Sequence, residues 1–136
     1  MISRNLADTA KIAKKISSKV KNGGLICLIG DLGSGKTTFT KALVAEFGIK
    51  HFNIKSPTYT YIRQYPHRKH KIYHIDLYRL ENFDRLFLEE LNEIFENKKN
   101  IIVIEWADKL ADFLPKKCLK INFEYLDKNS RKITIK

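Results

Sequence analysis

Cysteine is scarce in this chain: Cys27 and Cys118 are the only two among 136 residues. They form no C-x-x-C pair, and no cluster of ligand residues has the spacing of a zinc site. Both cysteines lie at apolar runs, so we expect buried, inert thiols rather than metal or redox chemistry. This use of cysteine is consistent with a reducing compartment.

Long apolar runs are also absent, and none approaches the ~20 residues that a membrane-spanning helix needs. The first residues, Met-Ile-Ser-Arg-Asn, contain no apolar signal-peptide region. The sequence shows no repeat, low-complexity tract or long linker. We therefore expect one cytoplasmic domain over residues 1–136, without membrane contact.

Acidic residues are few: 15 Asp and Glu stand against 26 Lys and Arg, for a formal charge of +11. Such a balance is typical of proteins that meet nucleic acid or another polyanion, but it also arises from biased composition. The basic residues are spread along the chain, with a modest concentration at 67–71, His-Arg-Lys-His-Lys. Charge alone therefore predicts solubility and non-specific attraction, not a function.

The hydrophobic pattern predicts strands and helices in alternation. Continuous apolar runs, typical of strands covered on both faces of a parallel sheet, occur at 25–29 and 101–104. Residues 71–77 resemble a further strand, and 56–65 an extended loop that enters one. Helical spacing of apolar residues occurs at 6–20, 39–47 and 86–95. Two alternating segments, 120–126 and 131–136, predict a terminal hairpin added antiparallel to the sheet.

Residues 30–37, Gly-Asp-Leu-Gly-Ser-Gly-Lys-Thr, match the phosphate-loop pattern G-x-x-x-x-G-K-[ST] throughout. Glycines let the backbone N–H groups converge on an anion, and the helix that follows points its positive end there. Lys36 is expected to contact the β- and γ-phosphates, and the Thr37 hydroxyl to bind Mg²⁺. The residues of this loop expected to contact ATP are Leu32, Gly33, Ser34, Gly35, Lys36, Thr37 and Thr38.

A strand before this loop and a helix after it predict the fold class. We expect an α/β protein with the P-loop NTPase fold: a mostly parallel sheet, helices on both faces, and an antiparallel C-terminal hairpin.

Two acidic residues end predicted strands and are candidates to complete the site. Glu105 follows the buried run 101–104, and Asp76 ends the strand at 71–77. The carboxyl ends of parallel strands meet at one edge of a sheet, so both carboxylates can reach the phosphate loop. One is expected to bind metal and the other to orient water or sense the γ-phosphate, and the residues leave open which does which. Asp76 could instead tie its own loop, for example to Arg79.

Three further residues have less specific patterns. Thr58, in Ser-Pro-Thr-Tyr-Thr, lies where nucleotide-sensing loops often occur, although such a segment is also a common turn. His74 is expected to be a packed strand residue rather than a base. Trp106, the only tryptophan, suits a core or interface position and could also flank the nucleotide.

Four segments together resemble the TsaE family, also called YjeE, of small bacterial P-loop ATPases needed to make threonylcarbamoyladenosine in transfer RNA. They are Gly-Asp-Leu-Gly-Ser-Gly-Lys-Thr-Thr-Phe (30–39), Ser-Pro-Thr-Tyr-Thr (56–60), Tyr-His-Ile-Asp-Leu-Tyr-Arg-Leu (73–80) and Ile-Glu-Trp (104–106). The last two are the most distinctive. One departure is Ala107, where the family often has proline.

The resemblance implies specific roles. Lys36 would contact phosphates, Thr37 and Glu105 would hold Mg²⁺, and Asp76 would assist hydrolysis. Thr58 would respond to the nucleotide, and Trp106 would lie near it. Leu6, Thr9 and Arg131 fall where the family approaches the base. The implied partners are a threonylcarbamoyl transferase subunit and its inactive paralogue (TsaD and TsaB type), with transfer RNA contacted indirectly through that complex. ATP hydrolysis would support repeated turnover of the complex.

Three rival functions fit less well. A small-molecule P-loop kinase, the main alternative, needs an arginine-bearing lid and a substrate pocket, for which 136 residues leave little room. A GTPase needs an Asn-Lys-x-Asp motif, which the sequence lacks. A stand-alone RNA-binding module of the RRM kind would show its aromatic motif, and none is present.

Overall fold

The computed structural model describes residues 1–50 and 61–136, and over these residues the chain forms one seven-stranded sheet in the order β1-β7-β6-β2-β5-β4-β3. The strands are β1 (Ile2–Ser3), β2 (Gly24–Gly30), β3 (Ile62–Tyr65), β4 (Ile72–Asp76), β5 (Ile101–Glu105), β6 (Leu119–Tyr125) and β7 (Arg131–Ile135).

The centre of the sheet is parallel. β2 pairs in parallel with β5 on one side and β6 on the other, and β5 pairs in parallel with β4. The apolar run of β2 explains its central place, because Ile26, Cys27 and Leu28 are completely buried between two layers of helix. Antiparallel strands, β3 at one edge and β7 with β1 at the other, complete the sheet.

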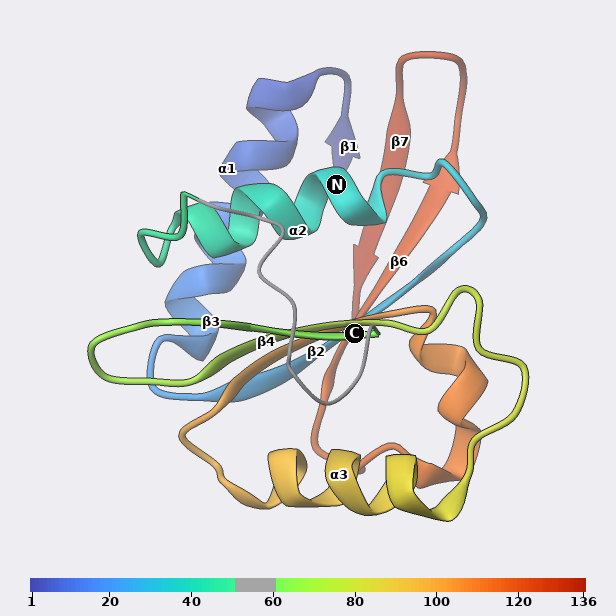
Figure 1. Ribbon diagram of the computed structural model, residues 1–136. Helices are drawn as coiled ribbons and strands as arrows, with labels where there is room; N and C mark the ends of the chain where they lie inside the picture. The colour runs from blue at the N-terminus through green and yellow to red at the C-terminus, as the bar shows by residue number, and fades with distance from the viewer. Residues whose placement is uncertain (51–60) are drawn as a thin grey trace.

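Helices cover both faces, as Figure 1 shows with α1 (Leu6–Val20) and α2 (Lys36–Ala45) above the sheet and α3 (Arg85–Glu96) below it. The 3-10 segment η1 (Ala107–Phe113) packs on the α3 side. Local sequence sets two helix starts: the Asn5 side chain accepts a hydrogen bond from the Asp8 N–H, and the Asp84 side chain accepts one from the Phe87 N–H. The apolar stripes of α1 and α3 then face the sheet, and each forms part of a buried core on its own side.

The predicted fold class is confirmed, with one correction to the hairpin. The two arms of the hairpin, β6 and β7, are antiparallel to each other, but β6 itself runs parallel to β2. The reason is the crossover through η1, which returns the chain from the end of β5 to the edge where β2 begins. The sequence pattern revealed neither the short β1 nor η1. Of the segment 56–65, residues 62–65 form β3, and 56–60 lie outside the described residues.

Two further expectations can be compared with the structure. No helix within the two described stretches has both the length and the apolar character to cross a bilayer. Cys27 is fully buried as predicted, whereas Cys118 is half-buried.

Candidate functional site

The phosphate loop lies between the carboxyl end of β2 and the amino end of α2, and its backbone depends on glycine. Gly33 and Gly35 have φ angles of +77° and +108°, a region that residues with a Cβ rarely adopt. Gly35 is the N-cap of α2 and supplies no side-chain hydrogen bond to the helix. The first N–H groups of α2 therefore face the loop, where an anion can accept from them.

The C-terminal hairpin forms one wall of this loop. The Tyr125 hydroxyl donates a hydrogen bond to the Gly33 carbonyl, and the Arg131 guanidinium stacks 5.2 Å from the centroid of the Tyr125 ring. A Cβ added at Gly35 would lie 3.2 Å from the Arg131 side chain. The hairpin therefore places Arg131 directly against the turn at Gly35.

Lys36 is nearly buried and bends back over the loop. Its ammonium donates hydrogen bonds to the carbonyls of Gly30, at 2.5 Å, and Asp31, at 2.8 Å. It also lies 4.2 Å from the centroid of the Trp106 ring, within the range of a cation–π contact. Burial lowers the pKa of Lys36, and nearby carboxylates, Glu105 foremost, offset this effect only in part.

A row of hydrogen-bonded side chains joins the loop to the sheet. The Thr37 hydroxyl donates to Glu105 Oε1 at 2.8 Å, and Glu105 Oε2 lies 2.5 Å from His74 Nε2. The other ring nitrogen, His74 Nδ1, lies 3.4 Å from Arg63 Nη1. Because a guanidinium can only donate, Nδ1 is the acceptor and Nε2 carries the proton given to Glu105. This arrangement fixes both the tautomer of His74 and the orientation of the Glu105 carboxylate.

Glu105 is 2% exposed, yet it is held in its ionised form. Burial raises the pKa of its carboxyl, but the hydrogen bonds from His74 and Thr37 and the charge of Lys36 outweigh burial. The net effect is a pKa below the ordinary value of 4.5. The site thus contains an oriented carboxylate that stays negatively charged at neutral pH.

Asp76 is the direct neighbour of Glu105, because the two residues pair in the register of β4 and β5. It is half-buried, and its Oδ1 accepts a hydrogen bond from the Tyr78 N–H at 3.0 Å. The structure therefore ties Asp76 to its own loop through the Tyr78 backbone. The sequence had suggested Arg79 for such a contact.

Trp106 adopts a backbone conformation that is rare for a bulky residue, with φ +60° and ψ +38°. This turn directs the ring across the end of the sheet, where it packs 5.2 Å from Tyr78 as well as beside Lys36. Strained positions of this kind are frequent at binding sites, because the surrounding structure must over-determine them.

These groups surround a pocket of about 620 Å³ at the carboxyl edge of the sheet. Of the residues predicted for the site, those lining it are Leu6, Thr9, Leu32, Gly33, Gly35, Lys36, Thr37, Thr38, Asp76, Glu105, Trp106 and Arg131. Ser34 is 1% exposed, and its hydroxyl oxygen lies 3.4 Å from Lys36 Nζ. Thr58 is outside the described residues.

The structure adds residues that the sequence interpretation missed. Further lining residues are Ser3, Arg4, Asn5, Tyr78, Phe123, Lys128, Asn129 and Ile133. Most of them come from β1, the turn before α1 and the terminal hairpin. The hairpin lies beside the loop because β6 pairs with β2, and β1 joins it by pairing with β7. His74 is buried in its strand as predicted, but it also orients Glu105. Period-two alternation in β4 places His74 on the same face as Asp76, which is the signal that could have revealed this role.

Comparisons with known proteins agree on one family. Residues 3–133 match the family model described as "Threonylcarbamoyl adenosine biosynthesis protein TsaE". A tRNA threonylcarbamoyladenosine biosynthesis protein TsaE from Aquifex aeolicus is 39% identical over 131 residues, 94% of this chain and 88% of the relative. Its counterpart from Rickettsia felis is 33% identical over 135 residues, 99% of this chain and 78% of the relative.

A solved structure has a similar fold. The crystal structure of YdiB from Bacillus subtilis superposes with a TM-score of 0.76 at 30% identity, covering 99% of this chain and 82% of that one. This chain therefore belongs to the TsaE family.

Proposed function

We propose that the chain binds ATP with Mg²⁺ in the pocket beside the phosphate loop and hydrolyses it. The observation that carries this proposal is the 2.8 Å hydrogen bond between Thr37 Oγ1 and Glu105 Oε1. It joins the last residue of the phosphate loop to the acid at the end of the neighbouring buried strand. That pair, next to the Lys36 ammonium, is the arrangement that phosphoryl transfer requires.

The donor set fits Mg²⁺. This ion prefers oxygen ligands and keeps several waters, so it commonly takes one or two protein oxygens together with phosphate oxygens. Thr37 and Glu105 provide a hydroxyl and an ionised carboxylate side by side. When bound, Mg²⁺ would neutralise charge on the phosphates. His74 holds Glu105 in the orientation that this role needs.

Lys36 and Asp76 are assigned two further roles in the site. Lys36 would exchange the carbonyls of Gly30 and Asp31 for the β- and γ-phosphates, since it lies within the loop that would bind them. Both oxygens of Glu105 are engaged by Thr37 and His74. Asp76 lines the pocket next to Glu105, and we assign it to orienting the attacking water.

We also propose a role in the synthesis of threonylcarbamoyladenosine in transfer RNA. This part rests on membership of the TsaE family and on the names of the relatives. In this role ATP hydrolysis would support repeated turnover of a threonylcarbamoyl transferase complex, made of the transferase subunit and its inactive paralogue (TsaD and TsaB type).

Two substitutions test the site. Lys36→Ala should abolish ATP binding in calorimetry, because the phosphates lose their only buried cation within the described loop. Glu105→Ala should leave ATP affinity within a few-fold of the parent while hydrolysis falls by about 100-fold or more, the usual scale for losing an electrostatic catalytic group. Unchanged affinity in the first variant would overturn the site, and normal hydrolysis in the second would move the acidic role to Asp76.

The biological role has its own test. A reconstituted mixture that synthesises threonylcarbamoyladenosine but lacks its ATPase component should regain repeated turnover on addition of this protein. The Glu105→Ala variant serves as the matched control, because it keeps the ATP pocket and lacks hydrolysis. Restoration by both proteins alike would show that hydrolysis is not the contribution this chain makes.

A further inference from the structure

The edge of the sheet opposite the ATP pocket concentrates positive charge. Four parallel strands, β4, β5, β2 and β6, all begin at this edge. The segments that lead into them contain nine basic residues and no Asp or Glu: Lys19, Lys21, Arg68, Lys69, Lys71, Lys98, Lys99, Lys116 and Lys117. We call these residues the basic edge. Parallel pairing thus gathers charges that are scattered through the sequence.

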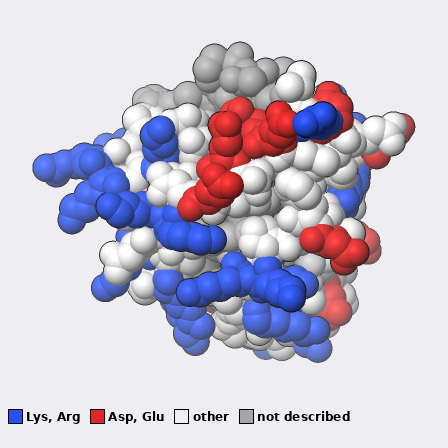
Figure 2. Space-filling model, turned by 90° about the horizontal axis from the view of Figure 1, so that it is seen from below, with Lys and Arg blue, Asp and Glu red and all other residues white. Residues whose placement is uncertain are grey.

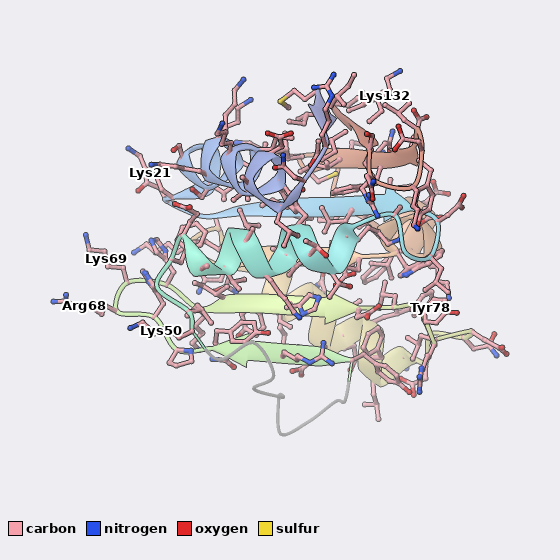
Figure 3. All side chains as sticks on the ribbon, turned by 90° about the horizontal axis from the view of Figure 1, so that it is seen from above. Lys21, Lys50, Arg68, Lys69, Tyr78 and Lys132 are labelled. Carbon is pink, nitrogen blue, oxygen red and sulfur yellow. The ribbon has the colours of Figure 1, made fainter. Side chains whose placement is uncertain are left out.

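Contacts between these segments make the basic edge continuous. The Gly24 N–H donates to the Asn100 carbonyl at 3.0 Å, and the Ile101 N–H donates to the Lys71 carbonyl at 3.0 Å. His70 Nδ1 lies 2.9 Å from the Lys99 carbonyl. In Figure 3, Lys21, Lys50, Arg68 and Lys69 lie together at one end of the molecule, and Tyr78, at the ATP pocket, lies at the other.

The charges of the basic edge are available to a partner. All nine side chains are exposed, and within residues 1–50 and 61–136 none of them forms an ion pair. Nearby charge also affects His67, whose pKa is lowered by burial and then by His70, Lys69 and Arg68. The acidic side chains that flank the segments are Glu96, at the end of α3, and Asp112, in η1.

The basic edge also contains a hollow. A pocket of about 520 Å³ opens between α1, the turn before β5 and the segment before β6. Lys19, Lys98, Lys116 and Lys117, from three separate segments, line it together with Asn97 and Asn100, and its remaining lining is mostly apolar, including Val20, Phe95 and Ile102. Lysines that converge on a hollow from several segments suit a row of phosphates, which need charge at several points rather than the planar recognition that arginine gives.

In Figure 2, which views the α3 face, most Lys and Arg lie toward the left and the bottom and most Asp and Glu toward the centre and right, with some basic side chains among the acidic ones. Residues 81–96, which include α3, hold six of the 15 acidic residues. This acidic helix repels a polyanion from its own surface, so the α3 face disfavours nucleic acid.

We propose that the basic edge binds the phosphate backbone of RNA directly, at the end of the molecule opposite the ATP pocket. The choice of transfer RNA as the polyanion rests on the proposed function. The positions of the two sites imply that ATP and RNA occupy the protein at the same time. Contact through lysines predicts binding governed by backbone charge with little dependence on base sequence.

The test is the binding of an unmodified transfer RNA transcript to the full chain, followed by fluorescence anisotropy at several salt concentrations. The variant Lys98→Glu/Lys116→Glu/Lys117→Glu reverses three charges that line the hollow. The matched control, Lys11→Glu/Lys14→Glu/Lys15→Glu, reverses three exposed lysines on α1 and changes net charge equally. Urea unfolding verifies that both variants remain folded.

The hollow variant should bind transfer RNA at least about tenfold more weakly, and its slope of log K against log salt should fall by about 2 to 3, close to 0.9 per lost phosphate contact. The control should stay within about threefold of the parent. Equal losses in both variants, or no binding by the parent at low salt, would overturn the proposal. So would displacement of the RNA by polyglutamate at equal charge, which would point to an acidic protein.

This inference and the proposed function can fail separately. Lys36→Ala should lose ATP binding and retain transfer RNA binding, whereas the hollow variant should show the reverse. Loss of both ligands in the folded Lys36→Ala protein would place RNA at the ATP pocket and overturn the basic edge as its site.

Discussion

His74 offers a sharp test of how the site is held together. It is 1% exposed and lies between Arg63 and Glu105, with its Nε2 2.5 Å from the Glu105 carboxylate. Replacing it with phenylalanine keeps an aromatic ring of similar size but removes the proton that Nε2 donates. Glu105, whose side chain is 3% exposed, then loses its partner on Oε2, while Thr37 still donates to Oε1.

The cost follows from the charge and burial of Glu105. A hydrogen bond to a charged group contributes about 1.5 to 3 kcal/mol to stability. A buried acceptor left without a partner also costs the free energy of its desolvation, which no hydrogen bond then offsets. We therefore expect His74→Phe to lower the free energy of unfolding by about 2 to 3 kcal/mol at pH 7. His74→Gln should recover much of this loss, because its amide can donate from a position close to Nε2.

The dependence on pH identifies the mechanism. The pKa of Glu105 in the folded protein lies below 4.5, so its ionised form stabilises the fold above pH 4.5. That stabilisation disappears as the pH falls through the lower, folded-state pKa. The difference between the parent and His74→Phe should therefore be full at pH 7 and shrink below pH 4.5.

Urea unfolding at pH 7 and at pH 3.5 to 4 measures these differences, and a double-mutant cycle isolates the contact. In a Glu105→Gln background the same His74→Phe change should cost less than in the parent. ATP hydrolysis should also need more Mg²⁺ in His74→Phe, because Glu105 is no longer oriented. Equal stability of the parent and His74→Phe at pH 7, or no benefit from glutamine, would refute the reasoning.

Two further predictions concern the loop and the tryptophan. Gly33→Ala should lower the free energy of unfolding by about 1 to 2 kcal/mol, because φ is +77° and the new Cβ would lie 2.7 Å from the Tyr125 hydroxyl. Urea unfolding measures this loss. Tyr125→Phe should partly rescue the variant, so absence of rescue would exclude the clash as the cause. Trp106 is the only tryptophan, and Lys36 Nζ lies 4.2 Å from its ring. Addition of ATP with Mg²⁺ should therefore change the intrinsic fluorescence in a saturable way, and a flat signal while calorimetry detects binding would show that Lys36 does not move.

Local patterns in the sequence were enough to predict much of this protein. The phosphate loop is contiguous, and its glycines and Lys36 are required by backbone geometry and charge, so its chemistry can be deduced without a fold. Buried parallel strands give continuous apolar runs, so β2 and β5 could be identified from the sequence. The end of the β5 run then identified Glu105 as a residue at a strand end. Helix stripes and caps are equally local, and α1 has the limits that its periodicity predicts.

Other features depend on pairing between distant segments, and only the tertiary structure decided them. Arg63, His74 and Glu105 come from three strands, and their contacts follow from a register that no single segment encodes. The direction of β6 was set by the crossover through η1, and the hairpin wall over Gly33 by β6–β7 pairing. The basic edge arises in the same way, because charges spread over residues 19–117 converge only when four strands begin side by side. Sequence alone thus determined the phosphate loop, because its chemistry lies in consecutive residues. The orientation of Glu105, and the placing of the basic edge at the end of the sheet opposite the pocket, required the sheet to form.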